Sequence, residues 1–552
     1  MKKINFLLCI VLFTSCVKKN TPIVINSQSI VIIDNNKEKE ITSNIENWLV
    51  QDIQIDTIPG ISLLKATESF LKEKTGDTVI VALIDMPVNI NHEGLKAHIW
   101  KNKNEIINNN IDDDKNGYID DINGWNFIGN LKGENIVFMN YEYTRILKAH
   151  SKGKYSDSSI LKQYNKAKIA HDSRTEYAIE AYENVKRMDS MFRQNKATIN
   201  YLFPDEITKE KVDSVKLQNL KNKSLLDAIE LFQLYQEEEI DEAYINETLL
   251  MAKNRIDVLL NVDFNDREKI GDNVNDLDNK DYGNNIVNHN LDVMTHGTLM
   301  AGIIVSHHNN ETLRQIIGKI KIMPLCISGY GDENDKDMAL AIKYAVDNGA
   351  DIINISSGKY FSMHENWVQD AVRYANKKNV LVVTSSGNNG LDLNAPGISN
   401  YPNDFSFSTN SEISNNFIKV GGSNYKMDST FVHPATNYGQ SEVDIFAPGE
   451  EIFTTSSLND STYTYSSGTS AAAAVFTKSA AIIKSFYPNF TASELKEILM
   501  KTGVEYNINV KMYDSLDNKV NIPFKKLSKS GKIVNVHNAL MLAELLSNNV
   551  SK

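Results

Sequence analysis

A continuous apolar run near the start of the chain limits its fold more than any other sequence feature. The run, Thr78–Asp85, reads Thr-Val-Ile-Val-Ala-Leu-Ile-Asp, so it is rich in β-branched residues and ends in an acid. Such runs are typical of central strands in a parallel sheet whose two faces are covered by helices, and we expect an α/β protein. Ligands bind beyond the carboxyl ends of strands in these sheets, where Asp85 would lie. A merely solvated strand-end Asp is the alternative.

The chain is long enough for one large domain with an insertion, or for two domains. It has 552 residues, of which 41% are hydrophobic, so it can bury a large core. Its net charge of -12 argues against a nucleic-acid-binding surface. The chain has 3 cysteines, Cys9, Cys16 and Cys326, which excludes a disulfide framework, and Cys326 is predicted to be buried.

The first residues, 1–16, have the pattern of an export signal. A basic start precedes a short apolar segment, Phe6–Phe13, which is too short to span a bilayer as a helix. The residues up to Cys16 resemble a bacterial lipobox, whose cysteine is lipidated; an ordinary signal peptide with a chance cysteine is the alternative. The lipobox predicts an exported protein that is lipid-anchored in the cell envelope, facing the periplasm or the surface. Residues 17–46 are polar and predict a tether.

An acidic loop, Asp112–Asp121, follows the first predicted strand. It has oxygen-bearing side chains at alternate positions and a glycine at the bend, which is the pattern that a hard cation such as Ca²⁺ requires. Its first half matches the start of an EF-hand loop, but the terminal Glu of that motif is missing. The expected calcium ligands are Asp112, Asp114, Asn116, Asp120 and Asp121. An acidic turn capped by Asx hydrogen bonds is the alternative.

A middle segment, residues 141–260, differs in composition from the rest of the chain. It is rich in Lys, Glu and Ala, and apolar residues recur at helical spacing in Thr175–Tyr182 and Ser224–Phe232. We expect several helices that form a lobe or a paired hairpin. They carry no chemical motif, so a cap over a cleft, a partner surface and a spacer are equally compatible. The acidic stretch that follows, 272–285, is predicted as an irregular loop, with a second cation site as the alternative.

Two further segments place a histidine and a serine at the starts of helices. His296 begins a small-residue helix, Thr295–Ile304, and Ser470 lies at a glycine-supported turn within Ser466–Ala474. Small residues permit a sharp turn, and the helix N-terminus behind Ser470 favours negative charge on its oxygen. Each residue alone is compatible with a structural role. Together with Asp85 they give the order acid, histidine, serine along the chain.

These motifs resemble those of the subtilisin-like serine proteases, the subtilases. The strand ending in Asp85 is similar to the family's acid motif, His296–Gly302 reads His-Gly-Thr-Leu-Met-Ala-Gly, and Gly468–Ser470 reads Gly-Thr-Ser. Other landmarks follow in the family's order: Ala350–Gly358, Val380–Asn388 and Asp444–Gly449. The resemblance implies a three-layer α/β/α fold with a mainly parallel central sheet. The catalytic domain would comprise residues 47–140 and 261–548, with the helical insertion, 141–260, between them.

The resemblance also implies the site and its chemistry. Asp85, His296 and Ser470 would form the catalytic triad of a serine endopeptidase, and Asn388 would stabilise the oxyanion. The main chain of a protein or peptide substrate would lie along these residues: Ser356, Ser357, Gly358, Ser386 and Gly387. The walls near Gly358 and Gly387 look open, which favours broad specificity. No cofactor is needed for the chemistry, so Ca²⁺ would have a structural role.

Two departures from the family pattern bear on activity. Met86 and Pro87 replace the small hydroxyl residue and the glycine that follow the acid, and Ala471 and Ala474 replace the usual methionine and proline after the serine. None of these changes removes a reacting atom. The alternative to an envelope-anchored endopeptidase is an inactive subtilase-fold lipoprotein that binds partners through its helical insertion. An esterase is a weaker third interpretation, because the chain has no Gly-x-Ser-x-Gly motif around Ser470.

Overall fold

The computed structural model describes residues 45–150, 158–204, 207–218, 221–307, 310–406, 409, 411–514 and 518–550. The chain divides into two compact units. The sheet unit comprises Met1–Asn135, Ile270–Ser328 and Glu333–Lys552, and the helical unit comprises Ile136–Lys269 and Gly329–Asp332. The predicted export signal, Cys16 and the predicted tether up to residue 44 lie outside the described residues.

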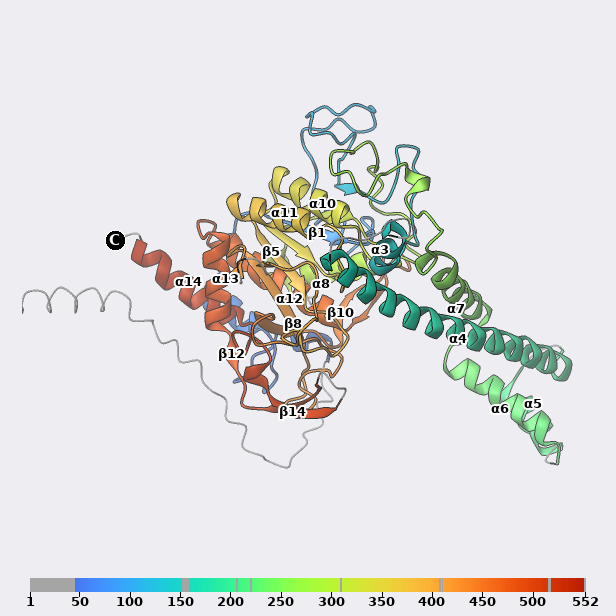
Figure 1. Ribbon diagram of the computed structural model, residues 1–552. Coiled ribbons are helices and arrows are strands. Elements are labelled where there is room, and N and C mark those ends of the chain that lie inside the picture. The colour runs from blue at the N-terminus through green and yellow to red at the C-terminus, as the bar shows by residue number, and fades with distance from the viewer. Residues whose placement is uncertain are drawn as a thin grey trace, which may run out of the picture. The chain divides into compact units, whose positions relative to one another are not determined.

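A nine-stranded sheet forms the centre of the sheet unit (Figure 1). Its strand order is β12-β15-β9-β8-β5-β4-β1-β3-β2, and neighbours pair in parallel except for β12 and β15. The strands are β1 Val79–Asp85, β2 Trp125–Asn126, β3 Ile320–Cys326, β4 Ile352–Ile355, β5 Leu381–Ser385, β8 Phe417–Ser423, β9 Ile445–Pro448, β12 Val504–Glu505 and β15 Lys532–Ile533. The small sheets are β6 Phe405–Ser406 with β7 Ser411–Glu412, β10 Ile452–Thr455 with β11 Tyr463–Ser466, and β13 Asn509–Tyr513 with β14 Lys519–Pro523.

Strand β1 is buried on both faces, as its continuous apolar sequence predicts. Val81 and Leu83 share one core with Met300 and Ala473, and the alternating residue Ile84 is also fully buried. Successive side chains of a strand point to opposite faces, so each face of β1 must be covered. Met300 and Ala473 belong to α8 (His296–Val305) and α12 (Thr469–Phe486), which pack on each other and on β1.

Helices flank the sheet and complete the predicted three-layer α/β/α fold. Besides α8 and α12, the helices α10 and α11 pack on each other and contact β1 and β5, respectively. The other helical elements of the sheet unit are η1 Ile45–Val50, α2 Leu63–Ala66, η2 Thr67–Leu71, α9 Glu311–Ile317, α10 Asp335–Asp347, α11 Glu365–Lys377, α13 Ala492–Thr502, η5 Phe524–Lys526 and α14 Val536–Val550. Cys326, at the end of β3, is fully buried as predicted.

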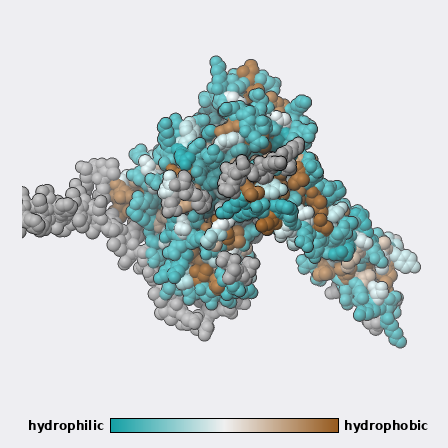
Figure 2. All heavy atoms as spheres, viewed as in Figure 1, coloured by the Kyte–Doolittle hydropathy of each residue, from teal (hydrophilic) through white to brown (hydrophobic). Residues whose placement is uncertain are grey.

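The helical unit contains the segment predicted from composition. Its elements are α3 Glu142–His150, α4 Ser158–Leu202, α5 Lys209–Gln218, α6 Lys223–Glu237, α7 Glu242–Asn254 and η3 Arg255–Leu259. The short helix η4, Glu268–Ile270, begins in this unit and ends at the first residue of the next part of the sheet unit. The long helix α4 packs against α3, α6 and α7, and its residues Phe192 and Ile199 contribute to two small apolar cores. Apolar side chains such as Ile169, Tyr177 and Tyr201 stay exposed on α4. Figure 2 shows apolar groups among the hydrophilic ones along these helices.

No helix within the described residues is long and apolar enough to cross a membrane.

Candidate active site

Asp85 lies at the carboxyl end of the central strand β1 and is 1% exposed. Its Oδ1 atom accepts a hydrogen bond from the backbone N of Met86 at 2.7 Å and lies 2.7 Å from Nδ1 of His296. A carboxylate only accepts hydrogen bonds, so Nδ1 of His296 carries the hydrogen and Nε2 is left as the basic nitrogen. The Oδ2 atom of Asp85 is buried without a hydrogen-bond partner among the described residues.

His296 is the first residue of α8, and Gly297 allows this helix to approach the turn after β1. A Cβ atom on Gly297 would stand 2.1 Å from the carbonyl oxygen of Met86 and 2.7 Å from that of Pro87. The His296 side chain is 33% exposed. Its burial disfavours the charged form, but the charge and hydrogen bond of Asp85 outweigh that effect, so the pKa of His296 is raised above 6.5.

Ser470 lies in the first turn of α12, after Gly468, whose φ of 126° excludes most other residues. Its Oγ atom donates to the carbonyl oxygen of Ser356 at 2.6 Å. The Ser356 hydroxyl in turn donates to the carbonyl oxygen of Ser470 at 3.0 Å. The structure thus joins Asp85 to His296 by a hydrogen bond, and it joins Ser470 to the segment after β4.

Asn388 is held in one orientation by Thr469, the residue before the serine. Its Oδ1 atom accepts from the backbone N of Thr469 at 2.9 Å and from the Thr469 hydroxyl at 3.0 Å. The Nδ2 donor of this exposed side chain is therefore turned away from Thr469. A hollow of about 230 Å³ opens beside Asn388 and is also lined by Gly468 and Gly449. Thr469 was not among the predicted site residues, although it belongs to the Gly-Thr-Ser motif.

The predicted substrate-binding residues lie on two segments that follow neighbouring parallel strands. Residues 356–358 follow β4 and residues 386–387 follow β5, and these strands pair through Ile355 and Thr384. The Ser386 hydroxyl donates to the carbonyl oxygen of Asn437 at 2.9 Å, so this side chain is bound inside the protein. Gly358 is exposed, but a Cβ atom on it would stand 2.9 Å from the carbonyl oxygen of Tyr401.

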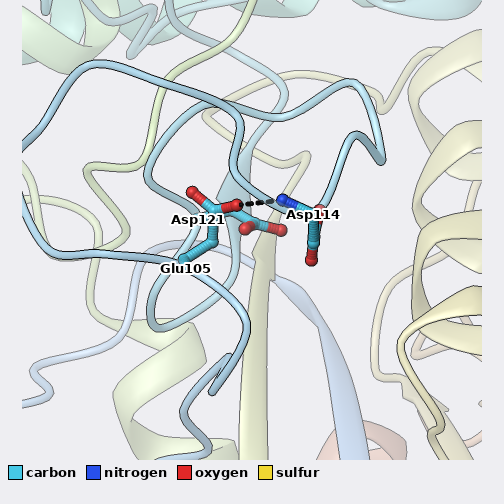
Figure 3. A group of neighbouring side chains, drawn as sticks. All are labelled: Glu105, Asp114 and Asp121. Atoms are coloured by element: carbon cyan, nitrogen blue, oxygen red, sulfur yellow. Dashed lines mark hydrogen bonds between the residues drawn. The ribbon is translucent and has the colours of Figure 1, made fainter.

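The acidic loop brings together a different set of carboxylates from the one predicted. Glu105, Asp114 and Asp121 each place one oxygen within 4.8 Å of the others (Figure 3). Glu105 was not among the predicted ligands because it lies outside the loop motif. Asp112 accepts backbone hydrogen bonds from Asn116 and Gly117, and Asp114 accepts one from Asn116, two positions further on, which is an Asx turn.

Two other predicted ligands in this loop have different positions. Asp120 accepts from the backbone N atoms of Asn109 and Asn110, and it is not a member of the cluster. Asn116 lies beside the carboxylate cluster, because its Nδ2 atom donates to Asp114 at 3.3 Å and to Asp121 at 3.1 Å. Burial raises the pKa of Asp121 despite hydrogen bonds from Tyr344, Asn102 and Asn116.

The acidic stretch 272–285 contacts a buried lysine side chain, Lys336. The Lys336 ammonium group pairs with Asp272, and both side chains are fully buried. It also donates to the carbonyl oxygen of Asn273 at 3.0 Å and to Oδ1 of Asn279 at 3.4 Å, and lies 4.5 Å from the Tyr282 ring centroid. Lys336 therefore neutralises Asp272, the first carboxylate of this stretch.

The family model Peptidase_S8, described as the subtilase family, matches residues 76–523, which is most of the chain and includes every predicted site residue except Cys16. The chain therefore belongs to the subtilase family. This match agrees with the nine-stranded, mainly parallel sheet and its flanking helices.

Curated relatives match over parts of their lengths. The chain is 30% identical over 255 residues to the cell wall-associated protease of Bacillus subtilis, a match that covers 44% of this chain and 26% of the relative. It is 33% identical over 185 residues to the thermophilic serine proteinase of Bacillus sp. strain AK1, covering 33% of this chain and 40% of the relative. A solved lanthipeptide protease has 25% identity and a TM-score of 0.35, covering 45% of this chain and 75% of that one.

Proposed function

We propose that this subtilase is a serine endopeptidase with Asp85, His296 and Ser470 as its catalytic triad. The observation that carries the proposal is the 2.7 Å hydrogen bond between His296 Nδ1 and Asp85 Oδ1 at the carboxyl edge of the sheet. It fixes the imidazole tautomer that has a basic Nε2 atom, and the raised pKa of His296 suits proton transfer near neutral pH. The curated relatives are named as proteases, which supports peptide bonds as the substrate class.

The reaction would begin with rotation of the Ser470 hydroxyl away from Ser356. The Oγ atom then attacks the scissile carbonyl carbon while His296 Nε2 takes its proton and later gives that proton to the leaving amine. Asp85 stabilises the imidazolium ion formed in between. A water molecule repeats the attack on the acyl-enzyme and releases the second product.

Negative charge on the attacked carbonyl oxygen would be stabilised by two donors. One is Nδ2 of Asn388. Thr469 donates both of its hydrogen bonds to Oδ1 of Asn388, so the Nδ2 atom can donate to the substrate. The other is the backbone N–H of Ser470 at the start of α12, where the helix dipole also favours an anion. The main chain of the substrate would pair with residues 356–358 as an added strand.

A second candidate function is partner binding by a catalytically weak subtilase fold. Two observations favour it: the Ser470 hydroxyl is bonded to Ser356, and Oδ2 of Asp85 is buried without a partner among the described residues. In this case the exposed apolar side chains of α4, including Tyr177 and Tyr201, would form the binding surface.

A fluorophosphonate probe distinguishes the two functions. The endopeptidase predicts covalent labelling of the wild-type protein, no labelling of Ser470→Ala, and cleavage of casein by the wild type alone. Ser467→Ala is the matched control, since this neighbouring serine only accepts a bond from the backbone of Glu451. A well-folded wild-type protein that is neither labelled nor active, with or without Ca²⁺, would contradict the endopeptidase.

The location in the cell follows from the proposed lipobox. Lipidation of Cys16 would anchor the protein to a membrane in the cell envelope, facing the periplasm or the surface. Fractionation of cells that express the full chain tests this, because Cys16→Ser should move the protein from the membrane to the soluble fraction. Recovery of both proteins in the same fraction would contradict the anchor.

Calcium would have a structural role in the acidic loop. The oxygens of Glu105, Asp114 and Asp121 suit a hard cation, and burial of Asp121 makes a neutralising charge favourable. Asn116 directs its amide nitrogen to Asp114 and Asp121, whereas its amide oxygen accepts from the backbone N of Tyr118 at 2.8 Å, so it supports the carboxylates as a hydrogen-bond donor. An ion there would hold the loop to the residues around Glu105, and it would take no part in the reaction.

A further inference from the structure

A hollow of about 410 Å³ lies within the helical unit, among α4, α6 and the start of α7. Both α6 and α7 pack beside α4 (Figure 1). The volume is within the range of about 300–1,000 Å³ that is usual for ligand-binding pockets. The apolar lining of the hollow comes from Phe192, Ile199, Phe232, Tyr235 and Ile240. We call this space, bordered by these five residues, the insertion hollow.

The insertion hollow separates two small apolar cores of the helical unit. Ile199 and Phe232 belong to the first core, whereas Phe192, Tyr235 and Ile240 belong to the second. Phe232 and Ile240 are only half-buried, so part of their apolar surface is accessible at the gap between the cores. Removal of this surface from water would favour the binding of apolar side chains from a partner.

The wall that α6 and α7 contribute to the insertion hollow is acidic. The segment 224–252, which contains most of both helices, has 8 Asp and Glu residues and no Lys, Arg or His. Five of these acids are exposed in the turn between the helices: Glu237, Glu238, Glu239, Asp241 and Glu242. Within the described part of the chain, Glu242 pairs with Lys196 and Arg193 of α4, and no ion pair involves the other four. The turn therefore has an excess of negative charge.

An apolar gap beside an acidic turn fits a ligand that has both apolar and cationic groups. Opposite charges across an interface speed association and suppress partners of the wrong charge. A fatty acid or an anionic lipid would be repelled by the carboxylates of the turn. An amphipathic helix with Lys or Arg on its polar face has the required combination, because its apolar side chains recur at three- and four-residue spacing along one face and can enter a groove between helices.

We propose that the insertion hollow is a docking site for a cationic amphipathic helix of a partner protein. The apolar face of that helix would fill the gap between the two cores, and its Lys or Arg side chains would pair with the acidic turn, residues 237–242. The proposal goes beyond the endopeptidase function, because it gives the helical insertion a partner and involves no residue of the triad. It also differs from the second candidate function, in which exposed side chains of α4 such as Tyr177 form the surface.

Peptide binding to the full-length Ser470→Ala protein tests the docking site without cleavage of the probes. The first probe is a synthetic peptide of leucine and lysine with leucines at helical spacing. The second has glutamate in place of every lysine, and the third has the composition of the first with leucine and lysine in alternation. We expect the first peptide to bind at least about tenfold more tightly than either of the others, and added salt to weaken its binding. No binding of the first peptide, or equal binding of the first and second, would overturn the proposal.

Two substitutions on α6 place the binding in the insertion hollow. Phe232→Ser changes a side chain that lines the hollow, whereas Leu234→Ser changes an exposed side chain of the same helix that does not line it. Phe232→Ser should lower the affinity for the first peptide at least about fivefold, because apolar contact area is lost, and Leu234→Ser should leave it unchanged. Equal effects of the two substitutions would contradict the site.

Charge variants keep the proposal testable if circular dichroism shows that Phe232→Ser does not fold. Glu238→Gln combined with Glu239→Gln removes two carboxylates of the acidic turn, and Glu176→Gln combined with Glu180→Gln removes two exposed carboxylates of α4 outside the hollow. The first combination should lower the affinity severalfold and weaken its salt dependence, and the second should change neither. An equal loss in both would show that the peptide responds only to the net charge of -12, and would overturn the docking site.

Discussion

Nδ1 of His296 lies 2.7 Å from Oδ1 of Asp85, although 211 positions separate the two residues in the chain. The contact forms because β1 ends at Asp85 and α8 begins at His296, and α8 packs on β1. The whole segment Ile136–Lys269, which belongs to the helical unit, lies between them in sequence.

The pH dependence of activity should reflect the raised pKa of His296. The imidazole must be neutral to accept the Ser470 proton, so kcat/KM should rise with pH and its acidic limb should have its midpoint above 6.5. Asp85→Asn removes the charge that raises this pKa. It should move the midpoint downward and lower kcat by about 10⁴, the effect known for this change in another Ser-His-Asp protease. An unchanged midpoint in Asp85→Asn would contradict the coupling.

The same pair should affect stability with a defined sign. The pKa of His296 is raised in the folded protein, so its protonation stabilises the fold fully at pH values below the pKa of the unfolded chain, about 6.5. This stabilisation is lost as the pH rises through the raised pKa of the folded protein. The difference in unfolding free energy between wild type and Asp85→Asn should therefore shrink as the pH increases above 6.5. Urea titrations at pH 5.5 and 9 measure it, and a difference that grows with pH would be inconsistent with the pair.

The amide of Asn388 should contribute to the rate and not to the fold. Asn388→Ala should lower kcat by about 10²–10³ with little change in KM, a loss known from subtilisin when one oxyanion donor is removed. Thr469→Val removes one of the two bonds that orient Asn388 and should have a smaller effect in the same direction. Asn394→Ala is the control, because this exposed asparagine binds Ser441 outside the site. Steady-state kinetics measure these effects, and a rise in KM with an unchanged kcat would argue against the role.

Gly297→Ala should disturb the approach of α8 to β1. The new methyl group would stand 2.1 Å from the carbonyl oxygen of Met86, which is a backbone atom and cannot rotate away. We expect a loss of about 1–3 kcal/mol in unfolding free energy and a fall in kcat/KM as His296 is displaced. Gly318→Ala, where the nearest atom is 3.0 Å away, should be milder. Equal effects of the two changes would show that the close contact is not needed.

Calcium should stabilise the protein through Glu105, Asp114 and Asp121. Free Ca²⁺ at a concentration of 100 times its Kd would add about 2.7 kcal/mol to the unfolding free energy. Chelation with EDTA should therefore lower the melting temperature, and Ca²⁺ should restore it. Glu105→Gln should lose most of this response. Asp112→Asn should keep it, since Asp112 only accepts backbone bonds from Asn116 and Gly117. Calorimetry with and without Ca²⁺ measures the response, and an equal loss in both variants would assign the ion to another site.

The sequence by itself determined the fold and the segments that form the site. The apolar run before Asp85 can only be stable with both faces covered, and the small residues after His296 and Ser470 permit close packing of α8 and α12. These are local properties of the backbone and of burial, and they are visible in a single stretch of chain. An α/β protein was predicted correctly for this reason, whereas the three-layer arrangement was predicted from the resemblance to the subtilases.

The tertiary structure alone decided which distant side chains meet. Glu105 joins Asp114 and Asp121 because the acidic loop folds back onto an earlier segment, whereas Asp120 points to Asn109 and Asn110. Asn400 reaches the glycines after β4 and β5 from a loop that has no motif of its own. Such contacts depend on how irregular segments pack on the sheet, and no periodic pattern in the sequence encodes that packing.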